Sequence, residues 1–362
     1  MTPPASIWSR KGRALFIKAA ALVVLNMTAL YGIDRVFGHF FPAYPVFLMP
    51  GLYRTNERGY FDGTDRGRDG KLYYAIDRSR ERDRAYKGAR FEKGSLQVLA
   101  IGDSFTYGQG VKLEDTYIKR LEHARAGRRI YGINLGESGA DVKDVLKQLS
   151  TNIDRYQPDL VVYGYVLNDP IEHRDSSVAP LDEENPFPDD GTRWDLINLR
   201  TPAMLAARGA AARWAGRHSR IADYLLATIE KRRVSAQSIQ HYLDLHDPEK
   251  NTRGLAETLS KISLMKKMAD GKGSRFVVMI FPILFNIDSD YPLLPVHRFL
   301  TRKFTEMGVD SIDLLPPFSR FKAEKLWVAP SDQHPNEVAQ SIAAEQIERW
   351  MRSRTNLLKS AK

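Results

Sequence analysis

Apolar and polar positions divide the chain into one long N-terminal apolar run and a larger region where short apolar runs alternate with amphipathic stretches. The short runs have the length and composition of buried strands, at 97–101, 129–134, 159–166, 275–281 and 309–312. Between them, apolar residues spaced three and four apart predict helices over 114–126, 141–156, 292–307 and 336–352. Strands that alternate with helices are typical of a parallel sheet covered on both faces, so the pattern predicts an α/β domain.

One interval between predicted strands is too long for a simple crossover. Residues 171–274 begin acidic and Pro-rich and continue as an Ala-, Arg- and Leu-rich stretch with helical spacing. We interpret this interval as an inserted helical cap. Its basic residues are Arg208, Arg213, Arg217, Arg220, Lys231, Arg232 and Arg233, against Asp223 and Glu230. Such a run is typical of a solvated face, and the alternative is an entrance to the site that attracts an anionic glycan.

The N-terminal apolar run, 14–33, is close to the length that crosses a bilayer as a helix, and Lys18 is its only charge. The residues before it are basic, whereas Asp34 and Arg35 after it cancel, so the positive-inside rule places the N-terminus in the cytoplasm. We therefore predict a single-pass anchor in the inner (cytoplasmic) membrane and a periplasmic or extracellular domain. A cleaved signal peptide and a buried amphipathic helix are the alternatives.

Composition excludes some chemistry. The chain has no cysteine, which excludes disulfides, a thiolate nucleophile and a zinc ribbon. Its net charge of +10 suits nucleic acid, anionic lipid or acidic polysaccharide. Nucleic acid is disfavoured because aromatic residues are not interleaved with the basic run of the cap. We find no metal-binding motif, so we expect no metal and no cofactor.

Three chemically useful residues follow predicted strands. Ser104 comes after the first strand, Gly139 after the second and Asn168 after the third. Ligands bind beyond the carboxyl ends of parallel strands, so these residues are expected along one edge of the sheet. A serine can act as a nucleophile, and backbone N–H groups at Ser104 and Gly139 with the Asn168 amide can stabilise an oxyanion.

A candidate base lies far along the chain. Asp332 and His334 precede the last predicted helix, and this pair can activate Ser104 if folding brings it across. Each feature also has a simpler interpretation, because Ser104 suits a helix N-cap and Asn168–Asp169 suits a turn. Those interpretations account for single blocks and not for the ordered set.

The ordered set resembles the SGNH (GDSL-type) hydrolase superfamily, in its membrane-anchored bacterial branch. The matching blocks are VLAIGDSFTYGQGV, NLGESGAD, YGYVLND and DQHPN. The resemblance implies a flavodoxin-like three-layer sandwich with Ser104 as nucleophile, Gly139 and Asn168 as oxyanion donors, His334 as base and Asp332 as its orienting acid. Two positions depart from the family pattern. Ser331 stands where the commoner D-x-x-H block has its acid, and Val166 stands where the third block has a glycine.

Together, these inferences predict how the chain is divided into segments. It comprises a cytoplasmic N-terminus (1–13), a transmembrane segment (14–33), a membrane-proximal segment (34–95), a hydrolase domain (96–352) with the insertion 171–274, and a tail (353–362). The predicted function is a membrane-anchored esterase that hydrolyses an O-acyl ester of a glycan or small molecule. The alternatives are an O-acetyltransferase of cell-surface polysaccharide and a catalytically silent polysaccharide-binding scaffold.

Overall fold

A computed structural model of the chain describes residues 10–40, 83, 91–124, 127–170, 209–329 and 332–354. It has two compact units, one made of Met1–Pro45 with Pro202–Arg233 and the other of Val46–Thr201 with Val234–Lys362. The described residues leave out most of the predicted membrane-proximal segment (34–95), the acidic part of the predicted insertion and most of the predicted tail.

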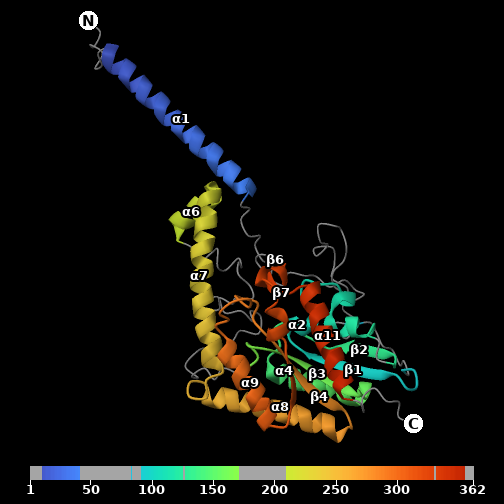
Figure 1. Cartoon of the computed structure of the whole chain (residues 1–362). Coiled ribbons are helices and arrows are strands. Elements are labelled where there is room, and N and C mark those ends of the chain that lie inside the picture. The colour runs from blue at the N-terminus through green and yellow to red at the C-terminus, as the bar shows by residue number, and fades with distance from the viewer. Residues whose placement is uncertain are drawn as a thin grey trace. The chain divides into compact units, whose positions relative to one another are not determined.

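The larger unit is built on five parallel strands in the order β2-β1-β3-β4-β5 (Figure 1). Their bounds are Leu96–Gly102 (β1), Ile130–Asn134 (β2), Leu160–Val166 (β3), Arg275–Phe281 (β4) and Asp310–Asp313 (β5). This is the flavodoxin-like doubly wound order, and it confirms the predicted α/β class. Its switch point lies between β1 and β3, where Gly102 pairs with Gly164.

Helices cover both faces of the sheet. On one face, α4 (Val142–Tyr156) and α8 (Thr252–Gly271) pack against each other and against β1 and β4. Elsewhere α3 (Tyr117–Leu121) packs on β2 and on α11 (Glu337–Ser353), and α9 (Leu294–Glu306) packs on β5. All seven residues of β3 are buried. This burial on two faces explains why the strands are continuous apolar runs in the sequence.

Two predicted elements differ from the structure. The helix predicted over 114–126 is a 3₁₀ turn, η3 (Leu113–Asp115), followed by the short α3. The break is at Thr116, whose backbone is extended and whose hydroxyl donates to the Leu113 carbonyl at 2.7 Å. The predicted insertion also includes α8, which buries Leu255, Ile262 and Met265 and serves as the crossover helix between β3 and β4.

Short elements complete the unit. They are α2 (Ser104–Tyr107), α10 (Leu315–Phe318), η4 (Ala323–Lys325) and an antiparallel pair, β6 (Trp327–Ala329) with β7 (Asp332–Pro335). The β6–β7 pair is absent from the sequence prediction, because its strands are only three and four residues long.

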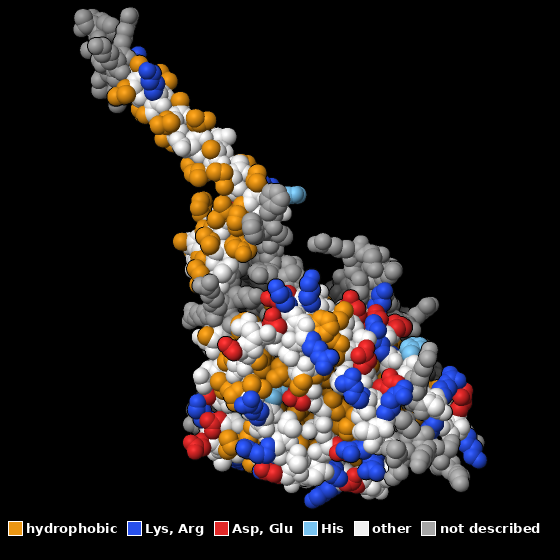
Figure 2. All heavy atoms as spheres, viewed as in Figure 1, with side chains coloured by type: hydrophobic (Ala, Val, Ile, Leu, Met, Phe, Trp, Pro, Cys, Tyr) orange, Lys and Arg blue, Asp and Glu red, His pale blue; other side chains and the backbone are white. Residues whose placement is uncertain are grey.

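The smaller unit contains α1 (Arg10–Phe40), α6 (Ala210–His218) and the beginning of α7 (Arg220–Leu245). Residues Arg13–His39 of α1 are long and apolar enough to cross a membrane, and none of the apolar window is buried. Figure 2 shows hydrophobic side chains along the surface of this helix. By length and composition alone, a signal sequence would pass the same test.

Candidate active site

Ser104 lies at the junction between β1 and the short helix α2. Asp103 caps that helix, because its carboxylate accepts a hydrogen bond from the Phe105 N–H at 2.9 Å. The N-cap role considered for Ser104 therefore belongs to its neighbour. Ser104 is the first residue of this helix, and only 8% of its surface is exposed.

Two glycines allow α2 to pack directly on the sheet. A Cβ at Gly102 or at Gly164 would collide with the Thr106 hydroxyl, and Gly102 also has a positive φ of 151°. Thr106 Oγ1 is within hydrogen-bond distance of Tyr117 Oη, at 3.1 Å. The nucleophile-bearing turn is thus fixed by side chains packed beneath it.

His334 reaches Ser104 from the far end of the sequence. Its Nε2 lies 2.9 Å from Ser104 Oγ across a separation of 230 residues, and its ring makes an edge contact with Phe105 at 5.4 Å between centroids. Both side chains are buried. With Nε2 unprotonated, the imidazole accepts the hydroxyl proton, which is the geometry of a serine activated by a general base.

The helix after His334 is anchored by two amides. Asn336 caps α11 by accepting from the N–H groups of Val338 and Ala339, and it donates to the carbonyls of Lys325 and Trp327 at 2.9 and 3.1 Å. Gln340 donates to the Phe105 carbonyl at 3.0 Å and accepts from the Tyr117 N–H at 2.8 Å. These bonds attach the histidine-bearing segment to the serine-bearing turn.

Gly139 and Asn168 lie in turns that follow β2 and β3. Gly139 has φ +83° and an exposed backbone, and the Asn168 side chain is exposed. Backbone bonds connect the three turns, from Glu137 N to Gly102 O at 3.0 Å and from Val142 N to Asp169 O at 3.4 Å. The turns carrying Ser104, Gly139 and Asn168 therefore share one sheet edge, and the oxyanion roles of the last two stay predictions.

The predicted acid, Asp332, is the first residue of β7, where its backbone pairs with Ala329. Its side chain and the whole of Ser331 lie outside the described residues. The role of Asp332 in orienting His334 is therefore a prediction.

Asp169 is a buried carboxyl, although its place in the sequence indicates only a turn. Its Oδ2 accepts from Tyr163 Oη at 2.7 Å and from the Val166 N–H at 3.1 Å, whereas Oδ1 has no hydrogen-bond partner. Burial, followed by the charge of Asp103, raises the pKa of Asp169 well above its ordinary value. A buried carboxyl with a raised pKa thus closes the turn that presents Asn168.

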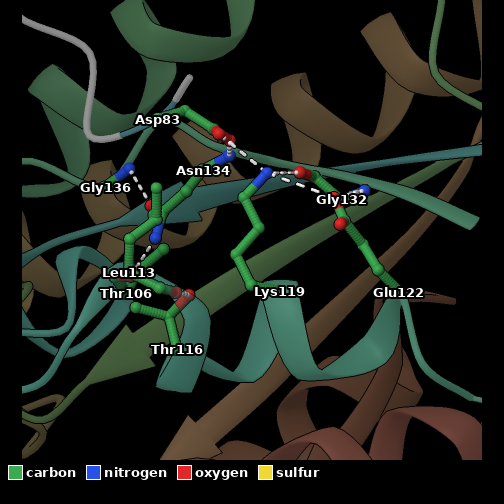
Figure 3. A network of polar contacts seen from close by, with 9 residues as sticks. All are labelled: Asp83, Thr106, Leu113, Thr116, Lys119, Glu122, Gly132, Asn134 and Gly136. Carbon is green, nitrogen blue, oxygen red and sulfur yellow. Dashed lines mark hydrogen bonds and ion pairs between the residues drawn. The ribbon is translucent and has the colours of Figure 1, made fainter. Parts of the chain in front are cut away.

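A second buried network joins Asp83, from the segment predicted as membrane-proximal, to strand β2 (Figure 3). Lys119 Nζ lies 2.7 Å from Asp83 Oδ1 and 3.2 Å from Glu122 Oε1, and it also donates to the Gly132 carbonyl. The other Asp83 oxygen accepts from the N–H of Asn134, the last residue of edge strand β2, at 2.7 Å.

Asn134 extends this network towards Ser104. Its amide donates to the Thr106 carbonyl and accepts from the Gly136 N–H, each at 2.9 Å. It therefore links the Ser104 turn to the turn after β2. Asp83 lies 13 positions before the predicted domain start at 96, so the larger unit also uses a residue of the segment predicted as membrane-proximal.

Among the described residues, no group of three or more His, Asp or Glu side chains is placed to hold a metal ion. The arrangement that the structure presents is a serine–histidine pair beneath exposed turns.

The comparisons with known proteins agree with this chemistry. Residues 98–192, which contain Ser104, Gly139 and Asn168, match the model of the GDSL-like lipase/acylhydrolase family. The match covers 95 of the 362 residues and identifies this segment as GDSL-like. His334 lies outside the matched residues, and the geometry brings it to the GDSL-like segment. A search of curated proteins gave no match.

Solved structures with low identity resemble the GDSL-like domain. A lipolytic protein of the G-D-S-L family from Desulfitobacterium hafniense is 11% identical, with 70% of this chain and 99% of that chain covered and a TM-score of 0.38. The esterase EstA from Pseudoalteromonas sp. is 12% identical, with coverages of 72% and 100% and a TM-score of 0.39. A catalytic mutant of Axe2, an acetylxylan esterase from Geobacillus stearothermophilus, is 12% identical, with coverages of 72% and 95% and a TM-score of 0.40. Because these TM-scores are below 0.5, the family assignment depends on the sequence match.

Proposed function

We propose that this GDSL-like protein is a membrane-anchored serine esterase that hydrolyses an O-acyl ester, most simply an acetyl ester, of a glycan or small molecule. The observation that carries the proposal is the 2.9 Å contact between Ser104 Oγ and His334 Nε2. A scaffold that only binds polysaccharide has no need of this buried pair.

In the first half-reaction, Ser104 Oγ attacks the ester carbonyl carbon while His334 Nε2 takes the hydroxyl proton. The carbonyl oxygen becomes an oxyanion, for which the N–H groups of Ser104 and Gly139 and the amide of Asn168 are the proposed donors. Collapse of the intermediate breaks the ester bond. His334 then returns its proton to the departing alcohol, and the acyl group stays on Ser104.

In the second half-reaction, water attacks the acyl-enzyme and His334 again takes and returns a proton. The products are the free acid and Ser104 in its starting form. Asp332 is the proposed partner that holds the imidazole in the required tautomer and stabilises the imidazolium. A sugar hydroxyl in place of water would make the same acyl-enzyme a transferase.

Labelling with a serine-directed fluorophosphonate tests the nucleophile. We expect Ser104→Ala to lose labelling and hydrolysis of chromogenic short-chain acyl esters while it stays folded. Ser150→Ala is the matched control, because that serine lies exposed on α4 and bonds only its own helix. Undiminished labelling of the Ser104 variant would contradict the assignment.

An activated acetyl donor distinguishes hydrolysis from transfer. With and without candidate oligosaccharides, we expect free acetate to exceed acetylated sugar. Faster transfer to sugar than to water would replace the esterase by the acetyltransferase.

The anchor has its own test. A reporter that is active only outside the cytoplasm, fused to the C-terminus, should be active and remain in the membrane after alkaline extraction. An inactive reporter on a stable fusion would contradict export, and release on extraction would contradict anchoring.

A further inference from the structure

The smaller unit contains a helix that buries none of its own residues. In α6, whose sequence is AAARWAGRH, no side chain is buried, and Trp214 is 66% exposed. A nine-residue helix of this kind is marginal in water and is normally stabilised by packing an apolar face. Here the apolar side consists of Ala210, Ala211, Trp214 and Ala215, which fall on one face by helical periodicity.

Within the same unit, α1 is bonded to the turn that joins α6 to α7. Asp34 is the one buried residue among 13–39, and its carboxylate accepts from Ser219 Oγ at 2.6 Å and from the N–H groups of Arg220 and Ile221 at 3.0 Å each. A side chain of α1 therefore caps the N-terminus of α7. Asp34 directly follows the apolar run 14–33, so the corner between α6 and α7 is fixed at the end of that run, inside the candidate span Arg13–His39.

The direction of α7 follows from two more contacts. Phe37, about one turn beyond Asp34, meets Tyr224 edge-on at 5.4 Å, about one turn beyond Arg220. Gly38 lies so close to the Arg220 side chain that a Cβ there would approach its Cγ to 2.7 Å. The two helices thus leave the apolar run in the same direction, with Arg220 and Tyr224 facing α1.

The remaining exposed apolar residues lie on the opposite side of α7. Leu225 and Ile229, four residues apart, are 54% and 64% exposed. By helical periodicity, they point away from the side that holds Arg220 and Tyr224. Leu225 and Ile229 follow the corner at Asp34 by about one and a half and two and a half turns of α7, whereas the apolar side of α6 precedes that corner.

Charge indicates which surface would cover these residues. Arg213 and Arg217 are exposed and four residues apart on α6, and positions 209–219 contain no acidic residue. Trp and Arg on a short amphipathic helix are typical of helices that lie in the headgroup layer of a membrane. The candidate span of 27 residues, Arg13–His39, would extend about 40 Å, which reaches through the headgroups as well as the hydrocarbon core.

We infer that α6 and the first turns of α7 form an interfacial surface that binds anionic phospholipid headgroups beside α1. The inference rests on the proposed membrane anchor and adds a second, in-plane contact to it. Apolar side chains of α6, with Leu225 and Ile229, enter the headgroup layer, and Arg213 and Arg217 pair with lipid phosphates.

Site-directed fluorescence in vesicles tests this surface, and the absence of cysteine lets one probe be placed at a time. Ala211→Cys, Leu225→Cys and Arg302→Cys in the full chain would carry a polarity-sensitive label, with Arg302 as the control on α9, where its side chain is 70% exposed. Vesicles of phosphatidylcholine are compared with vesicles that also contain phosphatidylglycerol.

We expect labels at 211 and 225 to be quenched by headgroup nitroxides and protected from aqueous iodide, and the label at 302 to show the reverse. Protection should increase with phosphatidylglycerol and fall in Arg213→Glu/Arg217→Glu, but not in Arg298→Glu/Arg302→Glu on α9. Asp34→Ala should expose the label at 225 while the protein stays anchored.

Iodide access at 211 and 225 equal to that at 302 would overturn the inference. So would energy transfer between labels on two copies, which would assign the surface to a second chain. Alkaline extraction of the same samples reports the anchor itself, so a failure of the anchor is distinguishable from a failure of the surface.

Discussion

Ser104 and His334 are held in position by different kinds of neighbouring residues. Ser104 is placed by backbone geometry and small residues, with Asp103 as the cap and glycines beneath Thr106. His334 is placed by amide side chains of the helix that follows it. The sequence could suggest both reacting residues because each lies in a short block at the end of a strand or before a helix. It could not show that Asp169 is a buried carboxyl with a raised pKa, because the shift depends on burial and on the nearby charge of Asp103.

The acid that orients His334 is tested by two neighbouring substitutions. Asp332→Asn should lower kcat by about 10⁴, because an amide favours the wrong imidazole tautomer and gives no charge to the imidazolium. Ser331→Ala should change kcat little. The measurement is steady-state hydrolysis of a chromogenic ester, and the opposite ranking would transfer the orienting role to position 331 or to another acid.

Asp169 should make stability depend on pH. Its folded pKa is raised, so the folded chain keeps a proton that the unfolded chain releases above about 4, and stability falls as the pH rises towards the folded pKa. Asp169→Asn keeps an acceptor for Tyr163 and Val166 and cannot ionise. Its unfolding free energy relative to wild type should therefore rise with pH, by at most about 1.4 kcal/mol per unit.

Denaturant unfolding at several pH values from 5 upwards measures this difference. Asp154→Asn is the control, since that carboxylate is exposed on α4. A difference for Asp169→Asn that stays constant with pH would mean that Asp169 is ionised in the folded chain.

At the scale of elements, the helices and strands that were predicted well are those in which buried residues recur with a single regular spacing along the whole element. Strand β4 is found at its predicted bounds, 275–281, because both of its faces are covered. The prediction of one helix over 114–126 is wrong. The Thr116 hydroxyl donates to the Leu113 carbonyl, so the 3₁₀ turn ends at Asp115 before α3 begins at Tyr117. The apolar spacing on the two sides of Thr116 cannot reveal that interruption. The pair β6–β7 could not be predicted, because its pairing depends on contacts between short segments.

Asn336 gives a prediction for the last helix. Asn336→Ala removes the cap of α11 and both bonds to the chain around β6, so the free energy of unfolding should fall by about 1–2 kcal/mol. Asn336→Asp keeps the cap acceptors and loses the donors, and it should fall between the alanine variant and wild type. Equal losses in the two variants would show that the cap contributes nothing and the donors contribute all of the effect.

At the scale of the whole molecule, the larger unit does not begin at its first strand. The Asp83 carboxylate pairs with the Lys119 ammonium and accepts a hydrogen bond from Asn134 at the end of β2. Nothing in the sequence pattern of 34–95 indicates this role. A lysine is rarely fully buried, so no pattern in the sequence predicts a buried partner for Lys119. Loss of Asp83 leaves that charge with Glu122 as its remaining acidic neighbour at hydrogen-bond distance among the described contacts.

We therefore expect Asp83→Ala in the full chain to lower the free energy of unfolding by about 3 kcal/mol, the cost of breaking a buried ion pair. The double variant Asp83→Leu/Lys119→Met should recover most of that loss, since neither partner is then charged. Thermal unfolding in detergent measures both, with Asp115→Ala, from a partly exposed pair, as control. A full loss in the double variant would mean that the bond to Asn134 matters and the ion pair does not.

The separation of 230 residues between Ser104 and His334 has a consequence for the order of events during synthesis. A chain made from its N-terminus presents the serine long before the histidine exists, and the histidine-bearing segment then needs α11 to hold it in place. We therefore expect the Ser104 hydroxyl to stay unactivated in the growing chain until His334 and α11 have been made. We expect a chain truncated before α11, which would lack residues 337–362, to lose the proposed esterase activity as completely as Ser104→Ala does.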